Sequence, residues 1–140
     1  MRLRVILAVL VAITLSVSVS VAEAQDENLV RKEMAALDKA FKITIDAVVL
    51  NQPEKIAPAF AEVQKIMKQV EQAVKDKKKI ALPRNQNKFK VFVKRDNRFH
   101  REVGALVIAA KKNRMRAVNR QTHNLLNMCA RCNDIFRKKA

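Results

Sequence analysis

The stretch "MRAVNRQTHNLLNMCARCNDIF", residues 115–136, carries its apolar side chains along one face of a predicted helix. Its inward positions recur at alternating steps of three and four, at Met115, Val118, Thr122, Leu125, Cys129, Cys132 and Phe136. Because an α-helix has 3.6 residues per turn, this spacing keeps all of these side chains on one stripe. A helix with a single apolar stripe needs partners that bury it, so the stretch predicts a helical bundle.

Three earlier runs repeat this spacing. We expect their inward positions at Val30, Met34, Leu37, Phe41, Ile45 and Val48; at Ile56, Phe60, Val63, Met67, Val70 and Val74; and at Phe89, Phe92, Asp96, Phe99, Val103, Leu106 and Ala110. Pro53 and Pro83 lie between the runs, and Pro58 predicts a late helix start or a kink. Short connections near residues 51 and 113 favour antiparallel neighbours, so we predict an all-α, up-down-up-down four-helix bundle.

The composition agrees with helices. The chain of 140 residues has one glycine and neither tryptophan nor tyrosine. Tight hairpins and phosphate-binding loops rely on glycine, so a β-rich fold and a nucleotide-binding loop are disfavoured. We also find no nucleophile–histidine–acid set and no pair of buried carboxylates, and we expect no enzymatic activity.

Residues 1–24 have the features of an export signal. Arg2 and Arg4 precede the apolar stretch "VILAVLVAI", and "AEA" before Gln25 is a small-x-small cleavage pattern. The apolar run is too short for a permanent transmembrane helix, although an uncleaved anchor is the alternative, and we expect no membrane span later in the chain. We therefore predict a signal peptide over residues 1–24, a bundle domain over residues 25–140, and a periplasmic or secreted protein.

The chain is strongly basic, with a net charge of +16. Removal of the predicted signal takes away Arg2, Arg4 and Glu23 and leaves +15. This charge favours acidic partners, anionic lipid or nucleic acid, and a solvated cationic surface explains it equally well. Export and the lack of a recognisable reading module weigh against nucleic acid.

Cys129 and Cys132 form a C-x-x-C pair on the inward stripe of the last helix. A step of three residues brings the second thiol nearly above the first, which suits two thioether bonds to one planar macrocycle. The pair suits a redox dithiol less well, because such pairs gain an acidic thiol at a helix N-terminus. It is also only half of a structural zinc site.

The segment "CARCNDIFR", residues 129–137, resembles the C-x-x-C-H-D-x-Y/F-R ending of the cytochrome c′ family, including its six-coordinate relatives. Every position matches except that Asn133 stands where the family has histidine. "LVRKEM" in the first helix is similar to the family's arginine before an apolar or methionine residue. The resemblance implies an exported four-helix bundle with haem c attached through Cys129 and Cys132, and a homodimer.

The same layout predicts which residues would surround a haem. Folding the chain through its short connections brings Met67 and Phe92 to the level of the thiols, where Phe136 of the motif also lies. Met34 would supply a thioether ligand to the iron, or would simply fill the core. Arg31 would face a haem propionate, or would lie on the ordinary helix surface. The carboxamide of Asn133, at the position of the missing histidine, is a poor iron ligand.

The two histidines do not replace the missing ligand in this prediction. His123 lies ten residues before Asn133 on an outward position, about 15 Å away along the axis. His100 flanks the stripe of the third helix, near the level of Leu125, and we expect both histidines at the surface or its boundary. Asp96 breaks the third stripe, and we expect it at a frayed or wet level of the core.

Three functions follow from these observations. The first is a cytochrome c′-like protein with unusual iron ligation that carries electrons or binds a small gas, and docks on acidic redox partners through its basic surface. The second is a degenerate relative that keeps the bundle without haem and acts as a binding or structural protein. The third is a thiol protein that cycles its cysteines or binds a soft metal.

Overall fold

The computed structural model describes residues 21–78 and 80–137, and within them the protein is all-helical. The predicted signal therefore lies mostly outside the described residues. The elements are α2 (Val21–Val49), the 3₁₀ turn η1 (Pro53–Lys55), α3 (Ile56–Ala59), α4 (Ala61–Lys75), the 3₁₀ turn η2 (Gln86–Lys88), α5 (Phe89–Lys111) and α6 (Met115–Phe136). Together these helices form a helical bundle, as the sequence predicts.

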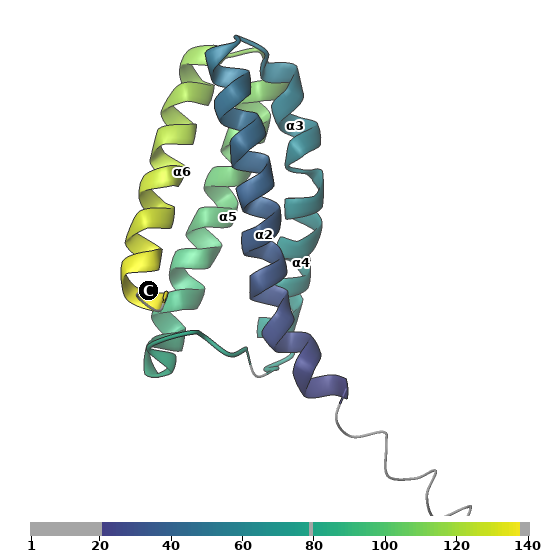
Figure 1. Ribbon diagram of the computed structural model, residues 1–140, viewed down its shortest axis with the longest axis vertical. Helices are drawn as coiled ribbons and strands as arrows, with labels where there is room; N and C mark the ends of the chain where they lie inside the picture. The colour runs from purple at the N-terminus through teal and green to yellow at the C-terminus, as the bar shows by residue number, and fades with distance from the viewer. Residues whose placement is uncertain (1–20, 79, 138–140) are drawn as a thin grey trace, which may run out of the picture.

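Figure 1 shows α2 beside the rod made by α3 and α4, and α5 beside α6. These neighbours in sequence make the closest helix pairs of the bundle. The short connections that follow α2 and α5 lie at one end, and the described parts of the longer connection between α4 and α5 lie at the other end. Within the described residues, no helix has both the length and the apolar character that crossing a membrane requires.

The second rod is interrupted at Phe60, between α3 and α4. Pro58 lies two residues before the break, and its missing N–H and its ring disturb hydrogen bonding with the turn before it, whereas the N–H of Phe60 still donates to the carbonyl of Ile56 at 3.2 Å. Phe60 has φ −89° and ψ −2°, and its ring is buried with its centroid 5.7 Å from that of Phe41. The helix is therefore interrupted near Pro58, and the predicted late start or kink stays a prediction.

Three helices end on residues with positive φ, although none of these residues is glycine. The residues are Asn51, Lys77 and Asn113, with φ of 55°, 55° and 51°. In each case the following N–H reaches back to a carbonyl five positions earlier, as in Gln52 to Ala47 at 2.8 Å. This is the Schellman pattern, which satisfies carbonyl groups left unpaired at a helix end and stops the helix sharply.

The connection between α4 and α5 is anchored by side chains of its described parts. Ile80 and Leu82 are buried against Phe92 and Phe136. The side-chain amide of Asn85, a residue at φ 58°, donates to the carbonyl of Ile135 at 2.6 Å. The segment therefore covers the end of α6 that carries the cysteines and helps to hold that end against α5.

Most of the predicted inward positions of α4, α5 and α6 are buried. The predicted inward stripe of α2 is partly wrong. Met34 and Ile45 are 46% and 45% exposed. The positions that α2 buries instead are Glu33, Ala40, Thr44 and Ala47. Small side chains let α2 approach its neighbours closely, and the Thr44 hydroxyl is satisfied because it donates to the carbonyl of Ala40 at 2.8 Å.

Candidate functional site

Cys129 and Cys132 lie near the C-terminal end of α6, half-buried and not joined by a disulfide. Cys129 packs against the core cluster that contains Met67, and Cys132 packs against the cluster that contains Phe92 and Phe136. The rings of Phe92 and Phe136 meet edge to face, with 5.4 Å between their centroids. The structure thus packs Cys132 with Phe92 and Phe136, and it packs Cys129 against the separate cluster that holds Met67.

Burial raises the pKa of both thiols. The pKa of Cys129 rises to about 11, chiefly through burial and further through the neighbouring Cys132. Burial also raises the pKa of Cys132, and the negative charges of Asp96 and Glu33 add to this while Arg95 opposes it. Both groups are therefore protonated thiols at neutral pH, whereas redox-active pairs rely on a stabilised thiolate.

The predicted iron ligand Met34 and Asn133, at the position of the missing histidine, do not face the core. Met34 is nearly half exposed on α2, and Asn133 is exposed on α6. Arg31 is exposed as well and takes part in an interaction of its own. The free thiols of Cys129 and Cys132 are the groups that would hold a haem, but the two hollows described for the protein are lined by other residues, and neither Met34 nor Asn133 provides an axial ligand in this arrangement. Axial ligation by Met34 stays a prediction.

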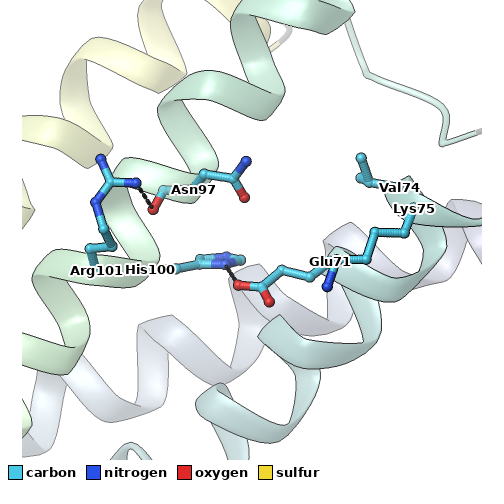
Figure 2. Close-up of a pocket in the computed structure, with 6 residues that line it drawn as sticks. All are labelled: Glu71, Val74, Lys75, Asn97, His100 and Arg101. Atoms are coloured by element: carbon cyan, nitrogen blue, oxygen red, sulfur yellow. Dashed lines mark hydrogen bonds and ion pairs between the residues drawn. The ribbon is translucent and has the colours of Figure 1, made fainter.

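A buried polar cluster lies close to Cys132, formed by Glu33 on α2, Glu71 on α4, and Asp96 and His100 on α5. His100 Nε2 lies 2.9 Å from Glu33 Oε1 and 3.3 Å from Asp96 Oδ2. His100 Nδ1 lies 3.0 Å from Glu71 Oε1, an interaction drawn in Figure 2. One imidazole thus contacts three carboxylates from three helices.

This cluster refines two expectations. Of the two places expected for His100, surface or boundary, the structure shows the boundary, with a side chain only 7% exposed, and Asp96 at 11% exposure does not lie at a frayed level of the core. The reason is that α2 and α4 present carboxylates to this face of α5, where they satisfy the imidazole. The sequence signal was Asp96 itself, since a charged residue on an inward stripe needs a buried partner, and His100 lies one turn later.

The carboxylates control the charge of His100. Burial alone lowers the pKa of His100, but hydrogen bonds with Asp96, Glu33 and Glu71 outweigh it and raise this pKa to about 10. The pKa of Glu33 is raised chiefly by burial, and its hydrogen bond to His100 acts in the opposite direction. Without a bound metal, the imidazole is therefore protonated at neutral pH and pairs with the carboxylates around it.

The cluster can be reached from the surface. A hollow of about 440 Å³ is lined by Glu71, Val74, Lys75, Asn97, His100 and Arg101. Figure 2 shows the side chains of His100 and Glu71 pointing toward each other across the space between α5 and α4. Glu71 is 42% exposed, whereas Glu33 behind His100 is 1% exposed. The hollow therefore leads from solvent to the outer side of the imidazole.

Comparison of the chain with protein-family models, with curated proteins and with solved structures finds no match. The chemistry of the thiol pair and of the polar cluster is therefore inferred from their own residues.

Proposed function

We propose that the protein is an exported, haem-carrying bundle in which Cys129 and Cys132 attach the haem. The proposal includes the signal peptide over residues 1–24, the up-down-up-down order of the helices, and a periplasmic or secreted mature chain. The observation that carries it is the placement of two half-buried thiols one turn apart on α6, each packed against a core cluster. This arrangement suits two bonds to one flat, apolar group lying along the helix.

Attachment needs no redox change in the cysteines. Cys129 and Cys132 would hold the haem by adding their S–H bonds across its vinyl groups, with sulfur on one carbon and hydrogen on the other. Phe92, Phe136 and Met67 would pack against the ring, and their burial would limit solvent access. When bound, the haem supplies one-electron chemistry at its iron.

The high pKa values of the thiols favour this function over thiol redox cycling. Their position near the C-terminal end of α6 agrees, because a helix C-terminus carries partial negative charge and disfavours a thiolate. The basic mature chain would attract an acidic redox partner through salt-sensitive contacts. The proposal includes a homodimer because the resemblance to the cytochrome c′ family implies one.

The exposed side chains of Met34 and Asn133 support a second candidate, a haem-free bundle that acts as a binding protein. In this candidate the thiols are remnants that fill the interface between α6 and its neighbours. The two candidates differ in the covalent state of Cys129 and Cys132, which can be measured directly.

The test is to export the chain in a host that matures c-type cytochromes, and then to measure intact mass and the visible spectrum. We expect a mass increment of one haem and a Soret band, both lost in the Cys129→Ser/Cys132→Ser variant. An unmodified mass with two free thiols would overturn the haem proposal for the natural chain. An Asn133→His variant tests the missing ligand, and Asn127→His, an exposed position earlier on α6, is its matched control. Haem gained by Asn133→His alone would favour the second candidate.

A further inference from the structure

We propose that Glu33, Asp96 and His100 form a binding site for a divalent metal ion of the zinc class, with Glu71 orienting the imidazole. The site lies inside the bundle between α2, α4 and α5, and it uses no residue of the thiol pair. It does not rest on haem attachment, because every group in it belongs to the protein chain.

The distances between the donor atoms match a metal polyhedron. One ligand atom from each of Glu33, Asp96 and His100 lies within 4.8 Å of the other two. The imidazole Nε2 lies 2.9 Å and 3.3 Å from the nearest oxygens of Glu33 and Asp96. A tetrahedral zinc site with bonds of about 2.1 Å separates its ligand atoms by about 3.4 Å. Small side-chain movements would therefore separate the three donor atoms enough to surround one ion.

Glu71 is placed to hold the imidazole of His100 without binding the ion itself. Its Oε1 lies 3.0 Å from His100 Nδ1, on the side of the ring opposite to Glu33 and Asp96. When Nδ1 carries the hydrogen and donates it to Glu71, the lone pair of Nε2 is directed between the two other carboxylates. This carboxylate–histidine–metal arrangement fixes the tautomer and the ring orientation in metal sites.

The second oxygen of Glu33 is an independent sign of a missing cation. Glu33 is 1% exposed, and its Oε2 has no hydrogen-bond partner among the described residues. A buried carboxylate oxygen without a partner is costly, and one imidazolium cannot neutralise three carboxylates. An ion between Glu33, Asp96 and His100 would satisfy this oxygen and offset the excess negative charge.

The set of donor atoms indicates the class of ion. One imidazole with two carboxylates suits zinc and related first-row ions, and a three-ligand site leaves a position for water. The hollow lined by Glu71 and His100 reaches the Nδ1 side of the ring, and neither Glu33 nor Asp96 lines it, so an ion would enter the Nε2 side only with movement of side chains. A purely structural network of buried ion pairs is the alternative, and it predicts no metal uptake.

The test uses the mature full-length chain, purified without haem and stripped with a chelator. Zinc binding is measured by calorimetry, and cobalt(II) serves as a spectroscopic probe through its visible d–d bands. We expect one equivalent of either ion, a rise in Tm on binding, and loss of both effects in Glu33→Gln and in His100→Gln. Glu71→Gln should still bind, with affinity lower by about 10- to 100-fold, as expected for an outer partner.

Matched variants separate this site from adventitious binding. Glu62→Gln removes an exposed carboxylate near the start of α4 and should leave affinity unchanged. Cys129→Ser/Cys132→Ser should also bind normally, so loss of binding in that variant would overturn the proposal by assigning the ion to the thiols. The absence of a one-equivalent site in the natural chain would overturn it as well. If His100→Gln fails to fold, Glu71→Gln keeps the test decisive, because unchanged affinity in that variant contradicts the proposed role of His100.

Discussion

At the scale of single residues, the chemistry of this protein depends on how completely each polar group is paired after burial. His100 contacts three carboxylates, whereas Glu33 keeps one oxygen without a partner among the described residues. Of the two thiols, Cys132 is also affected by the negative charges of Asp96 and Glu33. The carboxylates therefore keep the imidazole protonated against the effect of burial, whereas burial itself keeps the thiols protonated.

The raised pKa of Cys129 has a measurable consequence in the haem-free protein. Alkylation requires the thiolate, so the rate at Cys129 should stay low at neutral pH and rise as the pH approaches about 11. Protonation of the folded thiol contributes stability that is present below its ordinary pKa near 9 and is lost as the pH rises from there toward about 11. Mass spectrometry of iodoacetamide-treated protein over this range gives the rate at each cysteine.

The control is the same chain unfolded in denaturant, where both thiols should react as ordinary cysteines. Equal rates for the folded and unfolded chains at pH 8 would contradict the prediction and would mean that α6 exposes Cys129 fully.

At the scale of elements, the residues at which a helix ends differ from the residues on its buried face. The endings at Asn51, Lys77 and Asn113 rely on a left-handed residue, and asparagine tolerates this conformation better than most non-glycine residues. The buried face of α2 includes the small residues Ala40 and Ala47, which are fully buried. Met34 lies on the outward side of this helix and is 46% exposed.

The single glycine of the chain gives a prediction for α5. Gly104 lies inside this helix, and a Cβ added there meets no atom within 4 Å. Gly104→Ala should therefore raise the free energy of unfolding by about 0.5–1 kcal/mol, because alanine is the better helix former and loses less backbone freedom on folding. Urea denaturation followed by circular dichroism at 222 nm measures the change.

Gly104→Val is the matched variant, since it adds a β-branched side chain at the same position and should stabilise less. A destabilised Gly104→Ala protein would show that α5 makes a close contact at this position in solution.

At the scale of the whole molecule, a large positive charge surrounds an interior that holds acidic groups. The chain carries a net charge of +16, and the carboxylates of Glu33 and Asp96 lie in the core with His100. Repulsion among exposed lysines and arginines opposes compact folding and is screened by salt. Buried pairs are screened much less, so the two contributions can be separated by ionic strength.

We predict that added sodium chloride raises the Tm of the mature chain at pH 7. The rise should be greatest up to about 0.1–0.2 M, where the screening length falls to about 10 Å or less. Differential scanning calorimetry in a low-salt buffer provides the measurement, with sodium sulfate matched in ionic strength as a control for specific anion effects. A Tm that falls with salt would mean that surface ion pairs, rather than repulsion, dominate the stability.

Much of the candidate site could be predicted from the sequence, because its parts are local. The C-x-x-C step and the inward stripe place both thiols against the core, and the same stripes place Met67, Phe92 and Phe136 there. The cluster around His100 could not be predicted in this way. Its members come from positions 33, 71, 96 and 100, and no spacing within one helix relates Glu33 or Glu71 to His100.

The sequence by itself determined the helices, their breaks at Pro58 and in the connections, and the apolar faces of α4, α5 and α6, because these depend on contacts within a few residues along the chain. Only the tertiary structure decided the rotation of α2 and the convergence of three carboxylates on His100. Rotation about a helix axis depends on the partners that neighbouring helices present, and Glu33 rather than Met34 lies in the core, where its carboxylate pairs with His100 of α5, a contact that no spacing within α2 reveals.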